Sequence, residues 1–136
     1  MNKRNFYVLN TFLAFAVAVL FVQGFVWTLF RDDASHISVA IVGWWAVGLA
    51  ACGRGDWDRA SEIADDLVFL GLLGTVIGFA QALTAITPEN LVAGAADKMV
   101  GMFVQGAKTA LYTTIVGAVG NYWLRLNHLF LRARVG

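Results

Sequence analysis

Four apolar stretches take up most of this chain, and each is about as long as a lipid bilayer is thick. They cover residues 6–30, 36–53, 67–87 and 100–124. A bilayer core of ~30 Å needs about 20 apolar residues in a helix, because each residue adds ~1.5 Å. A soluble domain of 136 residues could not bury the surface of a chain that is 59% hydrophobic and 14% charged. The sequence therefore predicts an all-α membrane protein, a single domain over residues 1–136 with four transmembrane helices.

The remaining polar residues exclude several other functions. A formal net charge of +1 offers no basic surface for a nucleic acid. Cys52 is the single cysteine and lies in an apolar stretch, so no disulfide framework can form within one chain. Because no predicted span holds a cluster of His, Cys and carboxylate side chains, we expect no catalytic residues, no metal and no cofactor. The first stretch is longer than the ~7–15 apolar residues of a signal peptide, so we expect a retained helix.

Basic residues predict the orientation of the four helices. With the N-terminus inside, the cytoplasmic segments hold Lys3, Arg4, Arg54, Arg59, Arg125, Arg132 and Arg134. The outer loops then hold only Arg31 and Lys98. Cytoplasmic loops of membrane proteins are enriched in Lys and Arg, so both termini are expected inside. Within the inner connection, residues 54–66, the sequence predicts that Asp65 and Asp66 start the third helix, where the helix dipole favours anions. Trp57, Tyr122 and Trp123 lie near predicted span ends, as interfacial aromatics do.

A stripe of small residues runs along one face of the third predicted helix. At 100° per residue, Gly71, Gly74, Thr75 and Gly78 fall on the same side, while larger apolar residues cover the opposite side. The fourth predicted helix has a similar face, made of Gly106, Ala107, Ala110, Thr114, Gly117, Ala118 and Asn121, with Thr113 flanking it. Small residues let membrane helices approach closely, and spacing alone favours helix packing. The alternative is a polar seam that lines a path for a small cation.

These two faces carry a resemblance to a known family. GLLGTVIG at residues 71–78 resembles the signature of the MotA/TolQ/ExbB family, the membrane subunits of ion-driven motors. Further along the chain, Ala110, Leu111, Thr114 and Gly117 resemble the family's A-L-x-x-T-x-x-G motif. Further likenesses are the Asn121–Tyr122 pair near the inner end and the loop residues Asn90, Leu91 and Gly94. The resemblance covers roughly residues 66–127.

The resemblance implies a fold, a set of partners and a transported ion. It implies a homopentamer in the bacterial inner membrane, surrounding two copies of a single-span partner such as MotB, TolR or ExbD. An aspartate of that partner would be protonated and released as H⁺ passes, with Thr75 and Thr114 beside it, and ion flow would move the partner. The predicted spans hold no Asp or Glu of their own, which agrees with a carboxylate supplied from outside the chain. Thr113 beside Thr114 resembles sodium-driven relatives, so Na⁺ is an alternative to H⁺.

The chain also departs from the family pattern. Thr109 stands where ExbB and TolQ have a glutamate, and Lys108 beside it is charged well inside the fourth predicted span. Lys108 has two interpretations, a functional cation or a side chain that snorkels to the outer membrane surface. Residues 54–66 replace the large cytoplasmic domain of MotA, so we expect a compact motor acting through its partner's outer domain and not on a flagellar rotor. A non-conducting oligomeric scaffold or a holin-like protein is the competing hypothesis.

Overall fold

The described part of the chain is built from helices. The computed structural model describes residues 3–22, 24, 31, 36–84, 86, 88 and 96–132. Its helices are α1 (Lys3–Val22), α3 (Ile37–Arg54), α4 (Trp57–Leu83) and α5 (Ala96–Asn127), with the π-helical turn η1 (His128–Arg132) continuing α5. Within those residues no strand occurs, so the all-helical prediction is confirmed. The end of the first predicted span and the loop residues Asn90, Leu91 and Gly94 lie outside the described residues.

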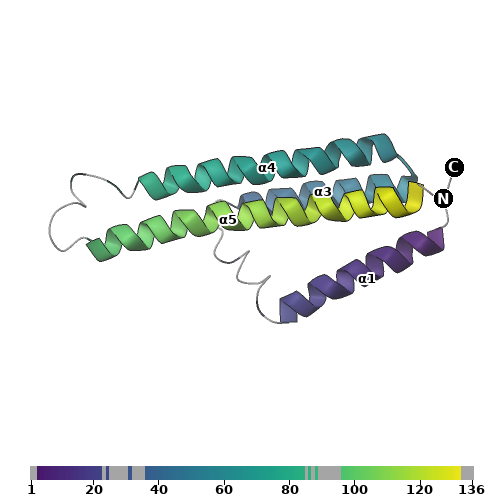
Figure 1. The fold of residues 1–136 in the computed structure, drawn as a ribbon, viewed down its shortest axis with the longest axis horizontal. Coiled ribbons are helices and arrows are strands. Elements are labelled where there is room, and N and C mark those ends of the chain that lie inside the picture. The colour runs from purple at the N-terminus through teal and green to yellow at the C-terminus, as the bar shows by residue number, and fades with distance from the viewer. Residues whose placement is uncertain are drawn as a thin grey trace.

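Helices α3, α4 and α5 form a bundle, and α1 leans against one side of it (Figure 1). The most extensive contact joins the antiparallel helices α4 and α5, and α3 packs against both of them. The N-terminal half of α1 contacts α5, and the rest of α1 diverges from the bundle. The start of α1, the α3–α4 turn and the end of α5 therefore lie at the same end of the molecule.

Two of the helices, α3 and α4, are long and apolar enough to cross a membrane. In α1 the described apolar stretch, Arg4–Val19, is shorter. Helix α5 is long enough, but polar residues within it lower its mean hydropathy: Gln105, Lys108, Thr109, Thr113 and Thr114. The structure thus supports membrane association for two helices, while the spans expected in α1 and α5 stay predictions.

The predicted inner connection is wrong in length, because α4 starts ten residues before position 67. Gly55 ends α3 in the left-handed conformation, with φ of 80°, and its N–H donates to the Cys52 carbonyl at 3.0 Å. That backbone geometry favours glycine, which has no Cβ to clash. Asp56 then caps α4 by accepting a hydrogen bond from the Arg59 backbone N–H at 3.3 Å. Only two residues therefore separate the two helices.

Asp65 and Asp66 consequently lie in the third turn of α4 and do not start it. The helix continues through these charged residues because its apolar side keeps helical spacing: Ala60, Ile63, Ala64 and Leu67 are all buried. Asp66 accepts a hydrogen bond from Trp44 Nε1 of α3 at 3.1 Å. The charged segment is thus part of the helix bundle.

The core lies between α3, α4 and α5 at the end that holds the α3–α4 turn. Ile41, Cys52, Leu67 and Leu124 are buried there, which agrees with an inert, buried Cys52 thiol. Trp123 was expected at a membrane surface, but it is only 8% exposed. Its ring packs edge-on against Trp45 at 4.9 Å between centroids, since Gly120 one turn earlier leaves room for Trp45 beside α5.

Candidate functional site

Glycines bring the backbones of α4 and α5 into direct contact. A Cβ atom on Gly78 would lie 2.5 Å from the backbone nitrogen of Ala110, and one on Gly117 would lie 2.5 Å from the Leu67 carbonyl oxygen. A Cβ on Gly71 would lie 3.2 Å from the Thr113 carbonyl oxygen. Small residues permit this approach in membrane helices. The packing residues expected from the sequence, Gly71, Gly74, Gly78, Ala110 and Gly117, are all buried between the two helices.

Thr113 fills the space that Gly74 leaves open. A Cβ on Gly74 would collide with the Thr113 side chain, which is fully buried. The Thr113 hydroxyl lies 3.0 Å from the Thr109 carbonyl oxygen and 3.2 Å from that of Ala110, so it donates to its own helix. Thr113 therefore lies inside the helix interface, and an ion-pathway role for it stays a prediction.

Thr75 and Thr114 meet at the edge of the same interface. Their hydroxyl oxygens are in hydrogen-bonding contact across the two helices. Thr75 Oγ1 also lies 3.1 Å from the Gly71 carbonyl oxygen, and Thr114 Oγ1 lies 3.0 Å from that of Ala110. Each hydroxyl has one proton and two lone pairs. The neighbouring carbonyls and the hydroxyl pair itself use both protons, so the oxygens keep lone pairs that are chemically able to accept a cation or an acidic proton.

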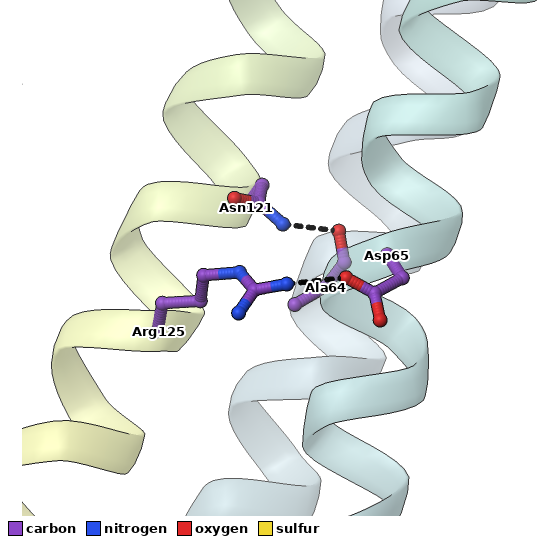
Figure 2. Close-up of polar contacts among 4 residues, drawn as sticks. All are labelled: Ala64, Asp65, Asn121 and Arg125. Carbon is purple, nitrogen blue, oxygen red and sulfur yellow. Dashed lines mark hydrogen bonds and ion pairs between the residues drawn. The ribbon is translucent and has the colours of Figure 1, made fainter.

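Two further contacts join α5 to α4 along this edge, nearer the α3–α4 turn (Figure 2). Asn121 Nδ2 donates to the Ala64 carbonyl oxygen at 2.6 Å. One turn further, Arg125 Nη2 and Asp65 Oδ1 form an ion pair at 2.5 Å, and their side chains are 58% and 65% exposed. We call the line of Thr75, Thr114, Asn121, Asp65 and Arg125 the polar edge; Thr75 and Asn121 are half-buried and the other three are exposed.

Lys108 lies away from the polar edge. It is half-buried on α5, about 160° around the helix from Ala110 at 100° per residue. The position separates it from the threonine pair, and both interpretations of Lys108 stay predictions.

A second polar cluster, which the sequence did not reveal, holds α1 against α5. Asn10 Nδ2 donates to Asn127 Oδ1 at 2.7 Å, and Asn127 Nδ2 returns a bond to Asn10 Oδ1 at 3.1 Å. Trp123 Nε1 also donates to Asn10 Oδ1, at 2.7 Å. We call these three residues the α1 clasp. Asparagine inside an apolar stretch was the available signal, because a buried amide in a membrane helix needs a partner.

Comparison with family models, with curated proteins and with solved structures gave no match. The resemblance to the MotA/TolQ/ExbB family therefore rests on the residues of the two motifs. Across the described residues, no group of three or more His, Cys, Asp or Glu side chains is placed to hold a metal ion.

Proposed function

We propose that this chain is the channel subunit of an ion-driven membrane motor of the MotA/TolQ/ExbB type. It conducts H⁺ or Na⁺ together with a single-span partner that carries an aspartate, and ion flow moves that partner. The observation that carries the proposal is the hydroxyl pair of Thr75 and Thr114, held at the exposed edge of a glycine-packed interface. Hydroxyl oxygens with free lone pairs suit a hard cation or the proton of a carboxylic acid.

The need for a partner follows from the acidic residues that these helices lack. Between Leu67 and Leu83, α4 holds no Asp or Glu, and α5 holds none after Asp97. Hydroxyls do not titrate near neutral pH, so proton transport past them needs a carboxylate from another chain. The side chains that flank the hydroxyl pair are apolar and exposed, Val76 at 65% and Leu111 at 63%, which suits cover by neighbouring helices or lipid.

The proposed assembly is a homopentamer in a bacterial inner membrane, with four spans and both termini in the cytoplasm. The start of α1, the α3–α4 turn and the end of α5 share one end of the bundle, as that topology requires (Figure 1). Arg4, Arg54 and Arg125 all belong to this end, which supports its cytoplasmic location.

Purification of the tagged chain from its native membranes tests both the partner and the transport. We expect an oligomer that carries along a single-span protein with an aspartate in its span. In proteoliposomes this complex should pass protons or Na⁺ down a gradient. Thr75→Val and Thr114→Val keep the side-chain volume, and each should lower flux about tenfold, because losing an acceptor leaves the permeating cation less well solvated. Thr11→Val, an exposed threonine on α1, is the matched control.

A stable monomer without a single-span companion, or a purified complex that passes neither ion, would overturn the channel proposal. Flux driven by a pH gradient in sodium-free buffer would refute a requirement for Na⁺.

A non-conducting scaffold or holin-like protein is the second candidate, and one observation favours it. Carbonyls of Gly71 and Ala110 lie within reach of both hydroxyl protons, as in threonines that serve only helix packing. The scaffold predicts normal function in cells after Thr75→Val and Thr114→Val, whereas the channel predicts its loss.

A further inference from the structure

We propose that the Asp65–Arg125 ion pair is the gate at the cytoplasmic end of the cation path, and that the cavity beside it is the inner vestibule. This inference rests on the proposed channel function. It assigns a role to two charged residues that neither the small-residue faces nor the threonine pair includes.

The ion pair follows the threonine pair along the polar edge, nearer the α3–α4 turn. On α5, Thr114, Asn121 and Arg125 follow one another at intervals of seven and four residues, which places them on one helix face. On α4, Asp65 lies ten residues before Thr75, about 15 Å along the helix axis at ~1.5 Å per residue and about 80° around it at 100° per residue. Both side chains of the ion pair reach across the interface, so a cation that leaves the hydroxyls toward this end would meet them after Asn121 (Figure 2).

A cavity continues the polar edge beyond the ion pair. It has a volume of about 270 Å³ and lies between α4 and the end of α5. Arg125, Ser61 and His128 supply its polar lining. The volume is enough for several water molecules at ~30 Å³ each, and these side chains can hydrogen-bond to them. Water in this cavity would hydrate a cation arriving from Asp65.

The exposure of the pair suits a contact that opens and closes. With side chains 58% and 65% exposed, Arg125 and Asp65 form an ion pair of the kind that contributes little to folding. In the closed state, the Arg125 guanidinium is paired with the Asp65 carboxylate and keeps a cation from binding there. When Arg125 swings away, the permeating cation takes its place on Asp65, and the return of Arg125 displaces the cation into the cavity. If the cation is Na⁺, only ionic contacts change. If it is H⁺, an O–H bond forms on Asp65 as the proton leaves its donor and breaks as the proton passes to water in the cavity.

Two single variants should change flux in opposite directions. Arg125→Gln removes the guanidinium that blocks Asp65 and leaves the Asp65 carboxylate, so we expect flux to rise about fivefold or more. Asp65→Asn leaves an unpaired guanidinium in the path, so we expect flux to fall about tenfold or more, because like charges repel. The measurement is ion flux through the complex purified from native membranes, reconstituted in liposomes with a pH-sensitive or sodium-sensitive dye inside.

Arg59→Gln provides the matched control, since Arg59 is an exposed arginine about 120° around α4 from Asp65. Thermal unfolding of each variant shows whether the bundle is intact. If the ion pair only fastens α4 to α5, both variants loosen the same contact and change flux in the same direction. That result, or wild-type flux in both variants, would overturn the gate while leaving the channel proposal intact. If the wild-type complex does not conduct, the channel proposal and the gate fail together.

Discussion

At residue scale, neighbouring threonines take different places because each residue turns the helix by 100°. Thr113 points into the α4 interface beneath Gly74, and Thr114 reaches the polar edge where it meets Thr75. The sequence predicted that Thr113 and Thr114 both lie near one small-residue face. Residue spacing alone could not predict which of them is buried. Which of two adjacent hydroxyls is buried depends on the rotation of α5 against α4, and that rotation is determined by the contacts of both helices together.

The close backbone approach of α4 and α5 at Gly78 gives the first prediction. Gly78→Ala should lower the free energy of unfolding by about 1–3 kcal/mol, because overpacking forces the backbones apart. The new Cβ would lie 2.5 Å from the Ala110 nitrogen and 2.8 Å from its Cα, and backbone atoms cannot rotate away. Thermal or denaturant unfolding in mild detergent measures the effect.

Gly43→Ala is the control for this substitution. It also lies within a helix, but a Cβ there meets nothing within 4 Å. Alanine favours helix over glycine, so Gly43→Ala should be neutral or slightly stabilising. Equal stabilities for the two variants would mean that α4 and α5 do not pack this closely.

At the scale of elements, hydropathy predicted the helices better than their ends. Helix α4 extends to Trp57 because Ala60, Ile63 and Ala64 keep one side apolar, although charged residues interrupt the hydropathy. The cap at Asp56 and this spacing were both readable in the sequence. The ion pair of Asp65 with Arg125 was not, because it needs the register of two helices and joins residues that are 60 positions apart in the chain.

Because Asn10 makes every hydrogen bond of the α1 clasp to α5, we predict that this residue controls the docking of α1 against the bundle. Asn10→Ala removes the acceptor of the Trp123 N–H and the donor to Asn127 Oδ1, while Asn127 Nδ2 keeps its bond to the Trp123 carbonyl; Asn127 is fully buried. Leaving a buried polar group unpaired costs about 1–3 kcal/mol. Since α1 makes few other contacts with the bundle, we expect it to detach while α3, α4 and α5 stay folded.

Limited proteolysis in mild detergent measures this detachment as faster cleavage within α1. Asn5→Ala is the matched control, since Asn5 is a half-buried asparagine on α1 outside the clasp. If both variants are cleaved at the wild-type rate, other contacts hold α1 in place.

At the scale of the whole molecule, the helix ends that carry Arg4, Arg54 and Arg125 lie together at one end of the bundle. The sequence predicted four crossings and cytoplasmic termini from apolar length and basic residues. The structure adds that the α3–α4 turn, the start of α1 and the end of α5 lie at one end of the molecule (Figure 1). The Asp65–Arg125 pair is close to this end, because Asp65 lies in the third turn of α4 and Arg125 in the last turn of α5. The number of subunits could not follow from one chain, because it depends on contacts between copies.

The topology leads to the last prediction, which single cysteines can test. Asp58→Cys near the start of α4 and Pro88→Cys beyond its end replace exposed residues at opposite ends of this helix. If α4 crosses the membrane with both chain termini inside, a membrane-impermeant maleimide should label Asp58→Cys only from the cytoplasmic side. It should label Pro88→Cys only from the outer side. Cys52 is 0% exposed, so the unsubstituted chain should stay unlabelled and serves as the control. Exchanged sides would reverse the topology and place the Asp65–Arg125 pair outside, whereas labelling of both positions from one side would show that α4 does not span the membrane.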